Sequence, residues 1–180
     1  MRRSAATAFI AVCLAPSLAS ACWEEAGERY GVSPQLLYAM ARVESSLNPA
    51  AVNNSHRKDT GSYDIGLMQI NSSHLPRLAR HGINEADLYD PCTNIHVGAW
   101  LLADEVSRYG VSWEGVGAYN AACTQLRGKD CRAARAKYAW LVYRHLPTAV
   151  KPTTASRRIA AQATRAETVY VPILAVRVAP

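Results

Sequence analysis

The chain is organised around the stretch Ser33–Pro49, which reads S-P-Q-L-L-Y-A-M-A-R-V-E-S-S-L-N-P. Ser33 is a good N-cap because its hydroxyl can accept a hydrogen bond from a first-turn amide, and Pro34 suits the first helical position. Apolar side chains then recur at three- and four-residue spacing, which predicts a helix with one buried face. The residues on that face are Leu36, Leu37, Met40, Val43 and Leu47.

Glu44 falls on the same apolar face, four residues after Met40. Asn48 precedes Pro49 and therefore resists the helical region, which places Glu44 in or near the last turn. Desolvation and the negative end of the helix dipole would both favour a protonated carboxyl. A carboxylic acid that stays neutral near pH 7 can serve as a general acid. A plainer interpretation is also open, in which Glu44 pairs with an arginine or reaches the surface.

The start of the chain has the pattern of a secretory signal peptide over residues 1–21. Two arginines are followed by a mostly apolar segment over 5–18, too short to span a bilayer, and a small-x-small cleavage site ends at Ala21. We therefore expect an exported, periplasmic protein. Cleavage there would leave Cys22 first, which makes a lipid anchor at Cys22 an alternative. A lipid-attachment box prefers Leu where this chain has Ala19, so ordinary export is favoured.

Four cysteines remain after the predicted signal, namely Cys22, Cys92, Cys123 and Cys131. An even number in an oxidising compartment predicts two disulfides. Of the three possible connectivities we favour Cys22–Cys92 with Cys123–Cys131, because the second pair closes a short polar loop. The chain has no C-x-x-C pair, and its five histidines lack ligand spacing. We therefore expect neither a metal site nor another cofactor.

Residues 22–147 are predicted to form one domain, followed by a flexible basic tail over 148–180. The domain carries 13 Lys and Arg against 13 Asp and Glu, whereas the tail carries 5 against 1. A balanced domain lacks the clustered basic face that nucleic-acid binding requires, so no nucleic-acid partner is expected. The tail has too few apolar residues to order itself, and it could dock a partner. We expect a monomer without a membrane span.

Helical patterns dominate the domain. Residues 23–30, 75–81 and 91–109 each predict a helix, as do the segment after Ser112 and the last part of the domain. The polar segment 50–64 is expected to be a loop that borders a cleft. No alternating run is long enough for a major sheet, so the fold class is mostly α. Inward-facing positions in the later helices are Ile95, Trp100, Leu102, Val106, Tyr109, Trp113, Val116, Tyr119, Tyr138, Leu141, Val142, His145 and Leu146.

Three motifs occur in order: A-R-V-E-S-S-L-N-P around Glu44, G-L-M-Q-I-N over 66–71 and A-Y-N-A-A over 118–122. Together they resemble the lytic transglycosylases of the goose-type lysozyme-like superfamily. The likeness is greatest to the small exported enzymes of conjugation and of type III or type IV secretion. It covers residues 22–147 and implies a lysozyme-like single domain with a glycan-binding cleft. Its partner would be peptidoglycan glycan strands, and the tail could contact the secretion or conjugation machinery.

The resemblance implies cleavage of the β-1,4 bond between N-acetylmuramic acid and N-acetylglucosamine, with a 1,6-anhydromuramoyl end as product. Glu44 matches the single catalytic acid of the family. It would protonate the leaving oxygen and then, as a carboxylate, accept the proton of the muramoyl C6 hydroxyl. Substrate-assisted glycosidases let the acetamido group shield the cation-like centre, so one acid suffices.

The family pattern also implies several substrate contacts. Met68 would line the cleft, and Gln69 would contact the sugar. Tyr119 and Asn120 would hold the acetamido group beside the acid. Tyr138 is a looser match on the last helix, and core packing explains it equally well. Amide and phenol side chains suit such contacts because they hydrogen-bond hydroxyl and acetamido groups without adding a competing charge.

One position departs from the family. The family commonly has a Gly-Ala pair before G-L-M-Q, where this chain has Tyr63 and Asp64. Asp64 could be a second carboxylate near Glu44, which would support a lysozyme-type hydrolase, or it could organise the loop, which we favour. A third alternative is a non-catalytic module whose cleft only binds peptidoglycan.

Overall fold

Helix α2 (Pro34–Ser45) begins where its sequence predicts, but it ends before Leu47. The Ser33 hydroxyl accepts a hydrogen bond from the Leu36 amide at 3.3 Å, and the helix ends at Ser46, whose φ of 54° is left-handed. Leu47, expected on the helical face, lies beyond this cap but still packs against the core. The computed structural model describes residues 18–123 and 125–147, so the tail and most of the predicted signal segment lie outside it.

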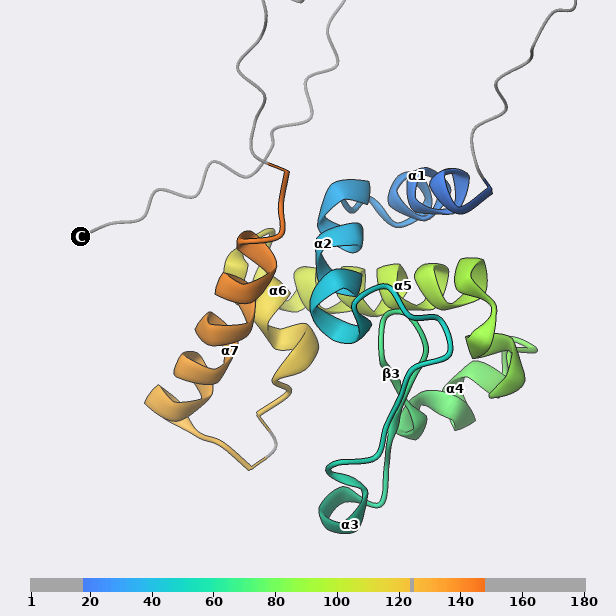
Figure 1. Ribbon diagram of the computed structural model, residues 1–180. Coiled ribbons are helices and arrows are strands. Elements are labelled where there is room, and N and C mark those ends of the chain that lie inside the picture. Colours follow the sequence, from blue (N-terminus) through green and yellow to red (C-terminus); the bar gives the residue numbers. More distant parts are fainter. Residues whose placement is uncertain (1–17, 124, 148–180) are drawn as a thin grey trace, which may run out of the picture.

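The described part of the chain is mostly helical, as expected (Figure 1). The long helix α5 lies across the middle of the view and contacts α1, α2 and α6, while α7 packs against α6 and α2. The remaining helices are α1 (Leu18–Tyr30), α3 (Arg57–Thr60), α4 (Leu75–Ala79), α5 (Pro91–Tyr109), α6 (Trp113–Asn120) and α7 (Gly128–Tyr143), with 3-10 turns η1 (Ser72–His74) and η2 (Ala86–Tyr89).

Helix α1 begins earlier than its pattern suggested. The expected start was residue 23, whereas the helix begins at Leu18, inside the predicted signal segment. The intervening Leu, Ala, Ser and Ala disfavour helix only weakly or not at all, so nothing in the sequence ends the helix at residue 22. The boundary at residue 21 remains a prediction.

The segment expected to be a loop, residues 50–64, contains secondary structure. It holds β1 (Val52–Asn53), α3 and the start of β2 (Asp64–Ile65). With β3 (Ile70–Asn71), these strands form an antiparallel sheet in the order β1-β2-β3. The prediction of a plain loop was therefore wrong. Two-residue strands are too short to show alternation in a sequence. We call the part of the chain from β1 to β3 the β lobe. In Figure 1 it projects from the helices, with α3 at its tip.

Both disulfides have the favoured pairing. Cys22 of α1 is joined to Cys92 of α5, and Cys123 is joined to Cys131 of α7, with Cα–Cα distances of 5.3 and 5.5 Å. The sulfur of Cys22 is therefore engaged in a bridge, whereas a lipid anchor would need the same atom. None of the helices in the described residues is both long and apolar enough to cross a membrane.

Part of the predicted core is wrong for the last helices. Ile95 and Leu102 are buried as expected, but Tyr109 and Leu141 are 42% and 39% exposed. His145 lies beyond the end of α7 and is exposed. The buried face of α7 consists of Arg135, Tyr138, Ala139 and Val142. Because the charged residue Arg135 occupies one of these positions, the apolar spacing in the sequence does not reveal this buried face.

Candidate active site

Glu44 lies in the last turn of α2, where its side chain is partly buried. The Tyr138 hydroxyl donates a hydrogen bond to its Oε1 at 2.5 Å, although the two residues are 94 positions apart. Among the described residues no lysine or arginine forms an ion pair with Glu44. The plainer interpretation, an arginine pair, is therefore not what the structure shows.

The environment of Glu44 brings the pKa of its carboxyl close to neutral pH. Burial raises the pKa of this carboxyl from 4.5 to about 7, the hydrogen bond from Tyr138 opposes that rise, and the charge of Asp64 adds to it. At a pKa near the ambient pH, a large fraction of molecules carries the proton while the conjugate base is also accessible. A group that first donates a proton and then accepts one needs both forms to be accessible.

Two phenols lie around the acid. Tyr138 comes from α7 and is buried, and Tyr119 comes from α6 and donates its hydroxyl to the Met68 carbonyl at 2.9 Å. Burial, and then the charge of Glu44, raise the pKa of both hydroxyls far above the usual range, so both remain phenols. Tyr138 is therefore a core residue whose hydroxyl also contacts Glu44, and the sugar contact expected from the family pattern stays a prediction.

The segment 66–69 is a turn between β2 and β3. Gln69 has a left-handed φ of 49°, and its Nε2 donates to the carbonyls of Gly66 and Ala51 at 2.8 and 3.3 Å. Its amide hydrogens are therefore used inside the lobe. The expectation that Met68 lines a cleft was wrong for the side chain, which is fully buried against Gly98 of α5. What Met68 presents to the site is its main-chain carbonyl.

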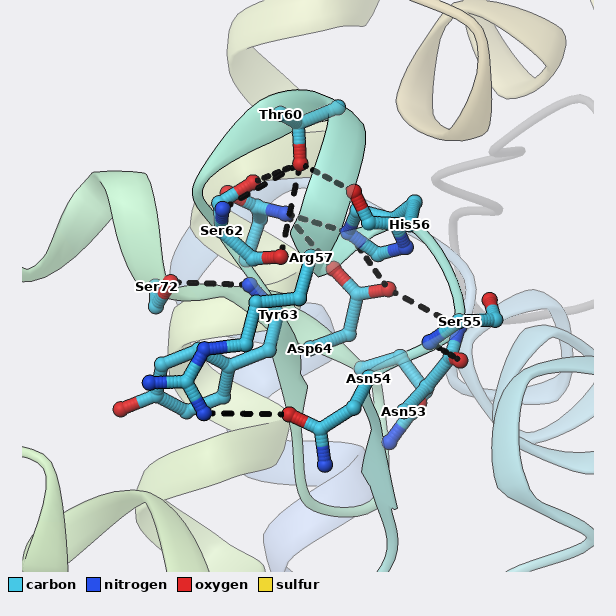
Figure 2. A network of polar contacts seen from close by, with 12 residues as sticks. Asn53, Asn54, Ser55, His56, Arg57, Thr60, Ser62, Tyr63, Asp64 and Ser72 are labelled. Carbon is cyan, nitrogen blue, oxygen red and sulfur yellow. Dashed lines mark hydrogen bonds and ion pairs between the residues drawn. The ribbon is translucent and has the colours of Figure 1, made fainter.

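Asp64 is held within the β lobe (Figure 2). Its Oδ1 accepts a hydrogen bond from Asn71 at 2.7 Å, and its Oδ2 accepts one from Asn53 at 3.2 Å. The Nε2 of His56 lies 3.6 Å from Oδ2. These contacts agree with the favoured role in organising the lobe. Asp64 also lies within electrostatic reach of Glu44, because its charge raises the pKa of that carboxyl.

Tyr63, the other departure from the family pattern, joins the lobe to residues outside its strands. Its hydroxyl donates to Glu85 at 2.8 Å, and its amide donates to the Ser72 hydroxyl at 3.0 Å. The Arg57 guanidinium lies over its ring (Figure 2), with Cζ 4.7 Å from the ring centroid. These contacts lead away from Glu44. Asn120 lies at the exposed end of α6.

Comparison with known proteins gives this arrangement a family. A model of the Transglycosylase SLT domain matches residues 21–141, which is more than half of the chain. The chain belongs to this family. It is a peptidoglycan lytic transglycosylase, and membership favours the enzymatic interpretations over a non-catalytic module.

Curated relatives of this transglycosylase include proteins of Salmonella and Shigella. Invasion protein IagB of Salmonella typhimurium (strain SL1344) is 47% identical over 126 residues, which cover 69% of this chain and 76% of IagB. Protein IpgF of Shigella flexneri is 42% identical over 154 residues, which cover 84% of this chain and 97% of IpgF.

A solved structure supports the fold class. Lytic transglycosylase Slt from Pseudomonas aeruginosa, determined as an inactive mutant, matches with a TM-score of 0.54 and 20% identity. The match covers 85% of this chain but only 25% of that protein. The mostly α, lysozyme-like fold predicted from the sequence is thus confirmed.

Two pockets in the described part of the transglycosylase lie away from the acid. One, of about 400 Å³, is bounded by α1, α2 and the end of α7, and the other, of about 750 Å³, by α1, α4 and α5. Glu44 lines neither pocket. The glycan-binding cleft therefore remains a prediction. No group of three or more His, Cys, Asp or Glu within residues 18–123 and 125–147 could hold a metal ion.

Sequence reasoning missed three polar residues near the site. His56 contacts Asp64, Ser45 donates its hydroxyl to the Leu67 carbonyl at 2.8 Å, and Asn94 is fully buried beneath the same turn. Asn94 was detectable, because it lies on the buried face of α5 together with Val97, as Glu44 lies on that of α2. The other two left no signal in the pattern.

Proposed function

We propose that this transglycosylase cleaves the β-1,4 bond between N-acetylmuramic acid and N-acetylglucosamine and leaves a 1,6-anhydromuramoyl end. The observation that carries the proposal is Glu44 itself. Its carboxyl is partly buried, has a pKa raised to about 7 by desolvation, and is in contact with a phenol and no cation in the described residues. This is the environment of a group that donates a proton to a leaving oxygen.

The reaction then needs one carboxyl. Glu44 donates its proton to the glycosidic oxygen as the bond from that oxygen to C1 breaks. The Tyr138 hydroxyl, already bonded to Oε1, stabilises the carboxylate that results. The carboxylate accepts the proton of the muramoyl C6 hydroxyl while O6 bonds to C1. No water is consumed, and Glu44 ends protonated as it began.

Substrate contacts in the proposal come from three places. The exposed Asn120 and the phenol oxygen of Tyr119 would bind the acetamido group, and the side-chain carbonyl of Gln69 would accept from a sugar hydroxyl. Met68 would contribute its main-chain surface only. The glycan strand would lie between α7 and the β lobe, across the exposed part of Glu44.

A second candidate is a lysozyme-type hydrolase, and Asp64 is the observation that favours it. Its carboxylate lies within electrostatic reach of Glu44, and two-carboxylate glycosidases need such a partner. However, the Asp64 oxygens accept hydrogen bonds from Asn53 and Asn71, which ties the group to the lobe. We therefore retain the anhydro-forming reaction as the main proposal.

We further propose that the enzyme is exported to the periplasm and opens the wall locally for a secretion or conjugation apparatus. The name of the relative IagB, an invasion protein, supports this role, as do two disulfides, which persist in oxidising compartments. The signal segment and the tail contact remain part of this proposal.

Mass spectrometry of muropeptides released from purified peptidoglycan by residues 22–180 tests the reaction. Anhydromuramoyl ends are the expected product, and the Glu44→Gln variant should release none above background. Reducing ends alone would establish the hydrolase, and no release by the wild-type chain would overturn both candidates.

A further inference from the structure

A buried amide lies directly beneath the turn that faces the acid. Asn94, in the first turn of α5, has no exposed surface. Its Oδ1 accepts from the Met68 amide at 2.7 Å, and its Nδ2 donates to the carbonyls of Ile65 and Leu88 at 3.1 and 2.7 Å. One side chain therefore holds the end of β2, the following turn and η2.

The turn above Asn94 has two faces. Its inner face offers the Met68 amide to Asn94, and its outer face offers the carbonyls of Leu67 and Met68. The Leu67 carbonyl accepts the hydroxyl of Ser45, the neighbour of Glu44, at 2.8 Å. The Met68 carbonyl accepts the hydroxyl of Tyr119 at 2.9 Å. The same short turn thus connects Asn94 to both sides of the acid.

The fit between Asn94 and the turn is close. A Cβ at Gly66 would come within 2.3 Å of Asn94 Nδ2 and 2.5 Å of the Leu88 carbonyl oxygen. Only glycine fits this position, and its φ of 75° is also one that glycine adopts without strain. A buried amide with both donors satisfied is costly to disturb, because each lost partner leaves a buried polar group unpaired.

We propose that Asn94 is a positioning residue for the transglycosylase reaction, which fixes Glu44 and Tyr119 through the 66–69 turn. The inference rests on the proposed role of Glu44 as the acid. Asn94 does not touch the acid, and its effect passes through main-chain carbonyls. If the turn loosens, Ser45 and Tyr119 lose fixed acceptors, and water gains access to the carboxyl.

The test compares Asn94→Ala with Leu78→Ala, which removes a fully buried side chain of α4, an element separate from the turn and from α5. Asn94→Ala should lower kcat about tenfold to a hundredfold, as expected for a misplaced catalytic group, with KM changed less than about threefold. Leu78→Ala should lower Tm by a similar amount with kcat per folded molecule unchanged.

A second readout does not depend on turnover. In ¹³C NMR titration of glutamate-labelled protein, with Glu44→Gln assigning the signal, Asn94→Ala should lower the pKa of Glu44 because water reaches the carboxyl. The other titratable groups coupled to Glu44, namely Tyr138, Tyr119 and Asp64, are retained in this variant. An unchanged pKa together with unchanged kcat per folded molecule would overturn the proposal.

A double-mutant cycle with Tyr119→Phe tests the route. If Asn94 acts through the turn, the two kcat losses should be less than multiplicative, and independent losses would contradict this route. Should Asn94→Ala not fold, Asn94→Ser replaces it, and failure of both to fold would show a role in folding and overturn the proposal. Because the titration reads Glu44 directly, a wild-type chain that forms no anhydro product would disprove the proposed function without affecting this result.

Discussion

Two carboxylates near the site lie in contrasting regions of the molecule. Glu44 ends a helix, is packed against α7 and receives one phenol hydrogen bond. Asp64 lies on a short strand of the β lobe, where Asn53, Asn71 and His56 surround its oxygens. Environment distinguishes the two carboxyls: burial raises the pKa of Glu44 to about 7, and the charge of Asp64 adds to that rise.

Removal of the Glu44 carboxyl should have the largest effect. Glu44→Gln should lose roughly three orders of magnitude in kcat, because the amide cannot protonate the leaving oxygen. The rate of anhydromuropeptide release measures it, with Tm as the control for folding. Turnover comparable to that of the wild-type chain would remove Glu44 from the comparison altogether.

Burial of Glu44 should also cost stability at high pH. Its folded pKa of about 7 lies above the unfolded 4.5, so the folded state binds more protons between these values and the free energy of unfolding falls as pH rises through them. The full loss is about 3 kcal/mol, complete above pH 7 and absent below 4.5. Urea unfolding at several pH values should show this decline in the wild type and a flatter profile in Glu44→Gln. Parallel profiles would show that the group is not desolvated.

Loss of the Tyr138 hydroxyl, which bonds to Glu44, should have the next largest effect on the rate. Tyr138→Phe removes a hydrogen bond that lowers the pKa of Glu44, so the alkaline limb of the pH–rate profile should move to higher pH. The rate should fall about tenfold, because the carboxylate formed during the reaction loses its donor. Tyr143→Phe, on an exposed face of the same helix, is the matched control. A shift toward lower pH would contradict the assigned contact.

Neutralisation of Asp64 should have the smallest effect on rate. Asp64→Asn removes a charge that raises the pKa of Glu44, so the alkaline limb should move to lower pH. The rate of the anhydro-forming reaction should stay within about tenfold, whereas a hydrolase that relies on Asp64 would lose about a hundredfold or more. Asp59→Asn, on the exposed helix α3, controls for charge on the lobe.

The helix that carries Glu44 was predictable from the sequence, whereas the β lobe that carries Asp64 was not. Helices α2, α5 and α6 could be located from their N-caps, Ser33, Asp90 and Ser112, together with the apolar spacing. The spacing alone placed Glu44 on the buried face of α2. The lobe was missed because two-residue strands leave no period to detect. The contact between Tyr138 and Glu44 joins distant parts of the chain, so no local pattern could show it.

The outer face of the 66–69 turn offers carbonyls, not side chains, to Ser45 and Tyr119. A peptide oxygen is present whatever amino acid occupies the position, so evolutionary drift at residues 67 and 68 can proceed within the limits of core volume and leave these acceptors in place. What must be preserved is the path of the main chain. That path depends on Gly66, because any side chain at this position would collide with Asn94.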